Sequence, residues 1–145
     1  KDDPLPPAMT LDAFAALATE GVPLSGLLGC RVVRLERGAC EVRLPFDATQ
    51  LRPGGTISGP AMMALADITL YGVVLSLIGR VELAVTTDLA IRFLRRPPPG
   101  DLLGRGKILR LSRRLAVGEV SILPDAGGEP VAHATGTYAI PDGGA

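Results

Sequence analysis

The 145-residue sequence has no tryptophan, only two cysteines and one histidine, and few aromatic residues of any kind. Because aromatic residues make up 3% of a chain that is 47% hydrophobic, its core must be filled by aliphatic side chains. Metal sites are usually built from His, Cys, Asp and Glu at short spacings, and the cysteines and the histidine form no such cluster. We therefore predict one domain without a metal and without a resident cofactor.

An excess of charge of either sign is also missing. Fifteen Lys and Arg residues balance fifteen Asp and Glu residues, so the formal net charge is zero and the sequence pI is about 6.8. Nucleic acids and anionic membrane surfaces attract proteins with a basic excess, so we expect neither as a partner. The N-terminal KDDPLPPAMT lacks the basic and then apolar order of a signal peptide, which favours a cytoplasmic location.

Residues 31–44 alternate polar and apolar side chains on both sides of Arg37-Gly38, which predicts a β-hairpin. A turn centred on this dipeptide places Cys40 opposite Leu35 and not opposite Cys30. The spacing therefore argues against a cross-strand disulfide and favours reduced cysteines.

The longest uncharged stretch, Gly54–Gly79, contains a single ionisable group, Asp67. We predict a helix over Gly59–Ile78, because Ser58 is a good N-cap and Pro60 falls in the first turn, where a missing N–H does no harm. Such a helix, of about 20 residues, is about 30 Å long. An unpartnered carboxylate away from water is costly, so we expect Asp67 to be paired, neutralised or employed chemically.

The same helix is long enough to span a membrane, with Asp67 as an intramembrane functional group. Against this alternative, glycine and proline crowd the start of the stretch, and no Lys or Arg cluster flanks it. The strands predicted elsewhere in the chain would also lose their core. We therefore favour a buried central helix and expect no membrane partner.

The other segments predict a single antiparallel sheet. A disordered tail over residues 1–9 and a short amphipathic helix that starts after Thr10 precede the hairpin. After the long helix, one face of a strand carries Val85, Thr87, Leu89, Ile91 and Phe93. Further strand-like segments follow at 102–111, 115–123 and 130–140. A helix that is apolar on nearly every side must be wrapped. We therefore predict an α+β fold with five or six antiparallel strands around one long central helix, in one domain over residues 10–145.

Two segments resemble a known family: RPGGTISGPAMMALAD (Arg52–Asp67) and AVTTDLAIRFLRR (Ala84–Arg96). Together with the tail from Gly128 to Tyr138, they are similar to hotdog-fold acyl-CoA thioesterases of the phenylacetic-acid-pathway (PaaI-like) type. The resemblance covers most of residues 30–140. It implies a hotdog fold, hydrolysis of the thioester bond of a small or aromatic acyl-CoA, and coenzyme A as part of the substrate and not as a cofactor.

The resemblance also implies site residues. Asp67 takes the position of the catalytic carboxylate, which either attacks the thioester or activates water, and Gly59 that of the residue whose N–H polarises the thioester carbonyl. Thr86 matches a hydroxyl position that helps hold the attacking water or the carboxylate. Free N–H groups at a helix N-terminus suit a developing oxyanion on physical grounds as well. The structural alternatives are an Asp67 that is only bonded to a neighbour, and a Thr86 present because it is β-branched.

Gly59 and Asp67 are eight residues apart on the predicted helix, about 12 Å along its axis. One reacting carbonyl carbon cannot easily contact both from a single chain. We therefore expect each site to combine Gly59 of one subunit with Asp67 of another, in a homodimer or a dimer of dimers. The acyl pocket is expected to be lined by Met63, Tyr71, Val74 and Val85.

Two residues depart from the family pattern: Arg52 occupies the family's Asn position and Ser58 its His position. Arginine offers only donors and a fixed charge, and serine can cap the helix but lacks an imidazole. We consider two consequences, either an impaired or rearranged catalytic site, or an Arg52 that selects an acyl group bearing its own carboxylate. Both residues stay candidates for substrate binding.

Two other functions on the same fold stay open. A non-catalytic acyl-CoA-binding module agrees with these departures. A hydratase or dehydratase would want a His–carboxylate pair, but His133 is far from Asp67 in sequence and is more typical of a structural or surface residue. Four arginines could contact the phosphates of coenzyme A or be solvated strand-end charges: Arg95, Arg96, Arg113 and Arg114.

Overall fold

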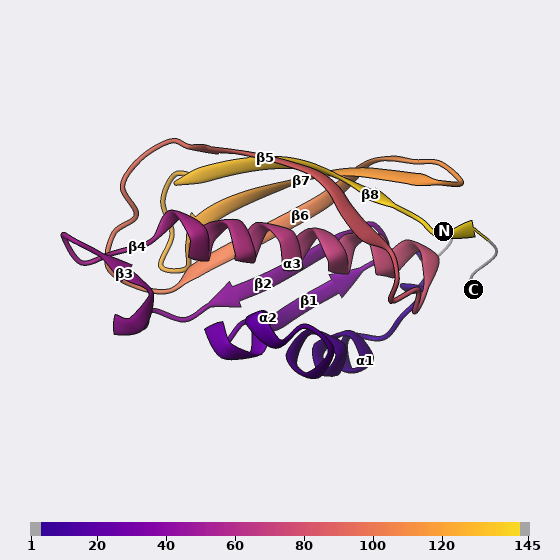
Figure 1. The fold of residues 1–145 in the computed structure, drawn as a ribbon, viewed down its shortest axis with the longest axis horizontal. Helices are drawn as coiled ribbons and strands as arrows, with labels where there is room; N and C mark the ends of the chain where they lie inside the picture. Colours follow the sequence, from indigo (N-terminus) through magenta and orange to yellow (C-terminus); the bar gives the residue numbers. More distant parts are fainter. Residues whose placement is uncertain (1–3, 143–145) are drawn as a thin grey trace.

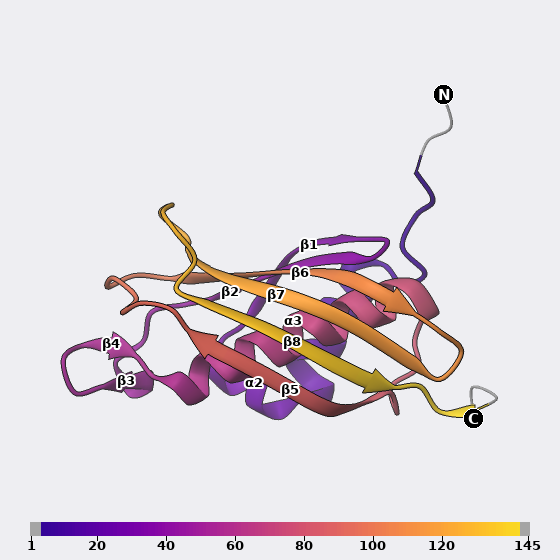
Figure 2. The ribbon, with the colours of Figure 1, turned by 90° about the horizontal axis from the view of Figure 1, so that it is seen from above.

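A computed structural model describes residues 4–142 of the chain. Six antiparallel strands form one sheet around the long helix α3 (Gly59–Ile78), as Figures 1 and 2 show. In space the strands run in the order β1-β2-β6-β7-β8-β5. Their bounds are β1 Arg31–Glu36, β2 Ala39–Leu44, β5 Val85–Phe93, β6 Leu102–Leu111, β7 Leu115–Pro124 and β8 Ala132–Ala139. The predicted α+β architecture, a hotdog arrangement of antiparallel strands around a central helix, is confirmed.

The central helix α3 begins and ends where the sequence predicts. The Ser58 hydroxyl accepts a hydrogen bond from the Ala61 N–H at 3.3 Å, and the Gly79 N–H donates to the Leu75 carbonyl at 2.9 Å. By length and composition the helix could cross a membrane, with a mean hydropathy of 2.0, but 72% of its apolar window is buried inside the fold. Burial within this sheet therefore accounts for the uncharged stretch.

The N-terminal helical region covers the part of α3 that the sheet leaves open. Helix α1 (Leu11–Ala16) begins as predicted at Thr10, whose hydroxyl accepts from the Ala13 N–H at 3.1 Å. The chain then widens into a π-helical turn, Leu17–Gly21, and a second short helix α2 (Pro23–Leu28), which the sequence pattern did not predict. Helix α1 packs on β1, and α2 packs on α3.

The predicted tail over residues 1–9 ends earlier than expected. Residues 1–3 lie outside the described residues. Met9 is only 6% exposed and belongs to the core, and the Ala8 N–H donates to the Ser76 carbonyl at 2.7 Å. These last two residues of the predicted tail are packed because they cover the C-terminal end of α3.

The β1–β2 hairpin turns at Arg37-Gly38, as predicted. Cys40 pairs in register with Leu35, and both Cys30 and Cys40 are free. A second, smaller hairpin joins β3 (Leu51–Arg52) to β4 (Thr56–Ile57) directly before α3. Sequence periodicity missed this hairpin because each strand has only two residues.

Strand β5 is interrupted by a bulge that the predicted alternation did not include. Thr86 pairs with Tyr138 of β8, but the next paired residue is Asp88, which pairs with Thr137, so Thr87 is the extra residue. Because a bulge shifts the side-chain period by one, Thr86 faces the helix together with Leu89. The predicted single face running from Val85 through Leu89 is therefore wrong, and this correction brings Thr86 to the site.

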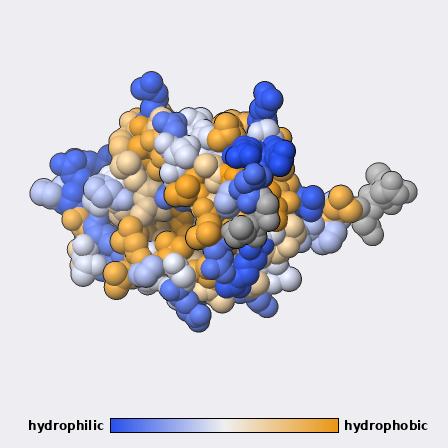
Figure 3. All heavy atoms as spheres, turned by 45° about the vertical axis from the view of Figure 1, so that its right-hand side comes forward, coloured by the Kyte–Doolittle hydropathy of each residue, from blue (hydrophilic) through white to orange (hydrophobic). Residues whose placement is uncertain are grey.

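The three later strands lie within two residues of their predicted bounds. The outer surface mixes hydrophobic and hydrophilic residues, as Figure 3 shows for one face of the molecule. Several large apolar side chains are exposed among the described residues, including Leu24, Leu27, Leu83, Val85 and Phe93. Strand β5 forms one edge of the sheet, so part of this apolar surface lies beside an unpaired strand.

Candidate active site

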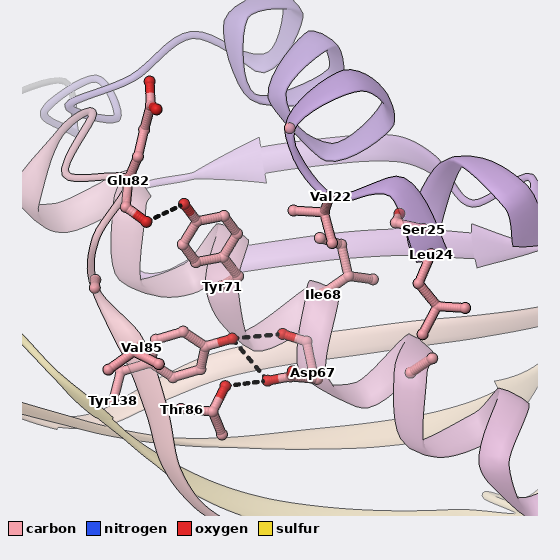
Figure 4. Close-up of a pocket in the computed structure, with 13 residues that line it drawn as sticks. Val22, Leu24, Ser25, Asp67, Ile68, Tyr71, Glu82, Val85, Thr86 and Tyr138 are labelled. Carbon is pink, nitrogen blue, oxygen red and sulfur yellow. Dashed lines mark hydrogen bonds between the residues drawn. The ribbon is translucent and has the colours of Figure 1, made fainter.

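The Asp67 carboxylate on α3 is held by two hydroxyl groups. Thr86 Oγ1 and Tyr138 Oη each donate to Asp67 Oδ1 at 2.7 Å, and Tyr138 Oη also lies 3.1 Å from the Asp67 carbonyl oxygen (Figure 4). Within residues 4–142, Oδ2 has no protein donor. The carboxylate is therefore fixed in orientation through one oxygen, while the other is available to a ligand or to water.

Tyr138 is the residue of this cluster that sequence reasoning missed. It is 3% exposed, and burial, followed by the negative charge of Asp67, raises the pKa of its phenol. At neutral pH the phenol therefore remains a protonated donor. The available signal was the Gly-Thr-Tyr at the end of the last strand, which served only as support for the family resemblance.

Three of the five aromatic residues of the chain meet beside this carboxylate. The rings of Tyr71 and Tyr138 stack with centroids 5.8 Å apart, and Phe14 meets Tyr71 edge-on at 5.9 Å. The Tyr71 hydroxyl donates to the Glu82 carbonyl at 3.0 Å. This packing fixes the ring that carries the Tyr138 hydroxyl, and so stabilises the position of the donor to Asp67.

A hollow of about 260 Å³ opens beside Asp67. Its walls come from four parts of the chain: the N-terminal helical region, α3, the segment from Glu82 to Thr86 at the start of β5, and Tyr138 of β8. Tyr71, Val85 and Thr86, all predicted to contact substrate, line it. Figure 4 shows Val22 and Leu24 of the N-terminal region on the side opposite Thr86. The hollow is thus mostly apolar, with the hydroxyl–carboxylate cluster at one end.

Two predicted pocket residues are not in this hollow. Val74 is 0% exposed, because two helical turns beyond Asp67 the helix lies inside the core. Met63 is 40% exposed on α3 and lines neither this hollow nor the one at the helix N-terminus. The prediction that Val74 lines the acyl pocket is therefore wrong, and the role of Met63 in substrate binding stays a prediction.

A second hollow, of about 480 Å³, surrounds the N-terminus of α3. Gly59 lies in it, together with Arg52, Arg95 and Arg96. Ser58 caps the Ala61 N–H, and Pro60 has no N–H to offer. Among the described residues, the Gly59 N–H has no acceptor, so it is a free donor beside the positive end of the helix dipole.

One chain therefore holds the two predicted catalytic residues in separate hollows. Gly59 and Asp67 are eight positions apart on a continuous helix, about 12 Å along the axis. The side chain of Arg52 lies with Gly59 and not with Asp67. A single chain does not bring the two together.

The other candidates are placed away from both hollows. His133 lies on β8, 3.7 Å from Glu119, with its side chain 41% exposed, and it makes no contact with Asp67. Arg113 and Arg114 pair with Asp142 at 3.2 and 3.0 Å. No group of three or more His, Cys, Asp or Glu side chains in the described part of the chain could hold a metal ion.

Comparison with known proteins identifies relatives over nearly the whole chain. The family model described as the thioesterase superfamily matches residues 54–131. A candidate thioesterase from Silicibacter sp. TM1040, whose crystal structure is known, is 41% identical over 93% of this chain and 94% of its own, with a TM-score of 0.83.

Two further relatives agree with that family. A mutant of the phenylacetic acid degradation protein PaaI from Thermus thermophilus is 28% identical over 82% of this chain and 99% of its own, with a TM-score of 0.73. A candidate esterase from Saccharolobus solfataricus is 32% identical over 113 residues, which are 78% of this chain and 79% of that protein.

Proposed function

Because this chain belongs to the thioesterase superfamily, we propose that it hydrolyses the thioester bond of a small or aromatic acyl-CoA at a site between two subunits. The observation that carries the proposal is the Asp67 carboxylate, oriented through Oδ1 by Thr86 and Tyr138, with Oδ2 unbonded by any described residue at the end of an apolar hollow. An oriented carboxylate beside an apolar pocket is suited to acyl transfer to water.

The chemistry follows from the free oxygen of Asp67. Either Oδ2 takes a proton from a water molecule that adds to the thioester carbon, or Oδ2 adds to that carbon and water then hydrolyses the anhydride. In both routes the C–S bond breaks, and the coenzyme A thiolate leaves and takes up a proton. In the first route the water oxygen enters the product acid; in the second, water cleaves the anhydride, and its oxygen enters either the product acid or Asp67, according to the carbonyl carbon that it attacks. Single-turnover hydrolysis in ¹⁸O-water tests for direct attack. Label in the Asp67 carboxylate would show an anhydride that water cleaves at the Asp67 carbon, because water activated by a general base delivers its oxygen only to the product acid.

The proposed site needs the Gly59 N–H of a second subunit as the donor to the developing oxyanion. Two observations support a dimer. The two residues lie in separate hollows of one chain, and the edge strand β5 exposes apolar side chains, with Val85 at 57% and Phe93 at 50%. An exposed apolar strand edge is suited to pairing with another copy.

The arginines beside Gly59 suit the coenzyme A part of the substrate. Arg52 and Arg96 line the hollow at the helix N-terminus, where Arg95 pairs with Glu129 at 2.7 Å. We place the phosphates of coenzyme A near Arg52 and Arg96, because guanidinium groups bind phosphate oxygens strongly. In this arrangement the acyl group lies on the Asp67 side.

A panel of acyl-CoA substrates tests the proposal. Aromatic, short, long and dicarboxylic acyl-CoAs are assayed with the wild type, Asp67→Asn and Asp88→Asn. Asp88 lies exposed on β5, two residues beyond Thr86, and serves as the matched control. We expect Asp67→Asn to abolish hydrolysis and Asp88→Asn to leave it unchanged. Tight acyl-CoA binding without turnover by the wild type would instead show a non-catalytic binding module.

A further inference from the structure

One wall of the Asp67 hollow comes from residues outside the part of the chain matched by the family model. The matched residues, 54–131, include Asp67 and Thr86. The opposite wall is made by Val22 and Leu24, at the start of α2. In Figure 4 Val22 lies near Ile68, and Leu24 projects toward α3. The residues that match the family model therefore do not determine how far the hollow extends toward α2.

This wall is held in place by packing. A Cβ added at Gly26 would lie 2.6 Å from the Thr19 carbonyl oxygen, so α2 lies directly against the π-helical turn. The Cys30 N–H closes the other end of α2 by donating to the Ser25 carbonyl at 3.0 Å. The position of Leu24 is thus set by the backbone, although the side chain is 56% exposed.

Leu24 exposes apolar surface at the hollow, and an apolar ligand would bury it. Burial of apolar surface is favourable by about 0.8 kcal/mol per methylene, or about four-fold in affinity. Leu27, three residues on in the same helix, is 83% exposed and does not line the hollow. The two leucines of this helix therefore form a matched pair, because one lines the hollow and the other does not.

The charges around the hollow select against an acidic ligand. The charged residues that line it are Asp67 and Glu82, both acidic. Glu82 is drawn with its carboxylate turned away from Tyr71 (Figure 4), where it pairs with Arg80 at 2.6 Å. Asp67 faces the hollow, and no Lys or Arg within residues 4–142 forms an ion pair with it. A carboxylate on the acyl group would enter a hollow whose charged lining residues are both acidic and which offers it no cationic partner of its own.

From these observations we infer that α2 sets the acyl specificity. Val22 and Leu24 contact the far end of an uncharged, apolar acyl group whose thioester lies at Asp67, and Leu24 limits its length. This inference rests on the proposed function. It replaces the hypothesis that Arg52 selects an acyl group bearing a carboxylate, because the proposed function assigns Arg52, which lies beside Gly59, to the phosphates of coenzyme A.

The test compares three variants with the wild type: Leu24→Ala, Leu24→Phe and the control Leu27→Ala. Hydrolysis is measured on straight-chain acyl-CoAs of increasing length and on ω-carboxylated analogues of matched length. We expect Leu24→Ala to shift the preferred chain toward longer acyl groups by about two to three methylenes, the size of the side chain removed. Leu24→Phe should shift it toward shorter ones, Leu27→Ala should match the wild type, and the ω-carboxylated analogues should react at least about ten-fold more slowly.

A second readout separates this inference from the proposed hydrolysis. S-alkyl-CoA thioethers cannot be hydrolysed, and their affinities are measured by calorimetry for the same four proteins. Opposite shifts of the two Leu24 variants in affinity would support the inference even if no protein hydrolysed a thioester. Identical length profiles for all four proteins would overturn it. Unchanged length profiles together with a weakened dimer in the Leu24 variants would also overturn it, because they would show that a second copy of the chain covers Leu24.

Discussion

The Tyr138 hydroxyl is one of two donors to the single bonded oxygen of Asp67, which makes its removal a direct test of carboxylate orientation. A hydrogen bond to a charged group contributes about 1.5–3 kcal/mol, so Tyr138→Phe should lower kcat/KM by about ten- to hundred-fold. The ring and its stacking on Tyr71 are retained. Tyr71→Phe, which removes a hydroxyl bonded only to the Glu82 carbonyl, is the control and should cost much less activity. Equal losses in the two variants would show that the loss of activity does not depend on the hydrogen bond from Tyr138 to Asp67.

Thr86 supplies the other donor, and its neighbour Thr87 provides a matched control. Thr86→Val keeps the shape of the side chain but removes the hydroxyl, so we expect kcat to fall about ten-fold or more with little change in thermal stability. Thr87 bonds the Thr137 carbonyl at 3.3 Å on the exposed side of the strand, and Thr87→Val should retain wild-type kcat. Rescue by Thr86→Ser would assign the effect to the hydroxyl.

At the residue scale, the sequence points to a candidate site residue where a short local pattern contains it. It misses a residue whose side chain reaches the site from a distant strand. Asp67 was evident because it is the only ionisable group in an apolar stretch. Tyr138, 71 residues later, could not be assigned from spacing, because its contact with Asp67 depends on how β8 packs against α3. Val74 was wrongly placed in the pocket because helical periodicity predicts which residues share a face of α3. It does not predict which elements cover that face two turns beyond Asp67.

At the element scale, the Ser58 N-cap stabilises α3 and helps to orient the Gly59 N–H. Ser58→Ala removes the side chain that accepts from Ala61, and should lower the free energy of unfolding by about 1 kcal/mol. For a chain of this size that is a fall in Tm of about 2–4 °C. Chemical denaturation measures it, and Ser58→Thr should retain most of the stability. No difference between the Ala and Thr variants would mean that the cap contributes nothing.

The elements that the sequence predicts well are those with long, unbroken patterns. The helix over Gly59–Ile78 and the hairpin at Arg37-Gly38 have strong start, stop and turn signals. The bulge at Thr87 has no such signal, since a single extra residue in an otherwise regular alternation is set by pairing with β8. The short helix α2 was missed because Gly21 and Pro23 read as a helix end, whereas Pro23 also starts the next helix.

For the whole molecule, we expect stability to fall at alkaline pH, because a thiol is buried in the core. Burial raises the pKa of the Cys40 thiol from 9.0 to about 12. Below pH 9 the thiol is neutral in both the folded and the unfolded chain. Between pH 9 and about 12 it ionises in the unfolded chain only, so the free energy of unfolding falls as the pH rises through this range. We expect the free energy of unfolding, measured in urea under reducing conditions, to fall by about 1 kcal/mol from this group between about pH 8 and pH 10. Cys40→Ala should show a correspondingly smaller fall; parallel curves would contradict this assignment.

The proposed two-subunit site can be tested by separating its two halves on different chains. Gly59→Pro removes the N–H that faces the proposed oxyanion, at a helix position where proline is tolerated. A Cβ at this position would lie 3.3 Å from the Phe93 ring, so Gly59→Ala is the control that keeps the N–H and introduces the same contact. We expect Gly59→Pro to lose most activity and Gly59→Ala to retain most of it.

Mixing Gly59→Pro with Asp67→Asn then distinguishes a shared site from a site within one chain. In a heterodimer, the Asp67→Asn chain supplies an intact Gly59 and the Gly59→Pro chain supplies an intact Asp67, so one of the two shared sites is complete. Random exchange of equal amounts makes half of the dimers mixed, and the mixture should recover about a quarter of wild-type activity. If both residues act from the same chain, every site carries one defect and no activity returns. The roughly 12 Å between the two residues on α3 favours the first outcome.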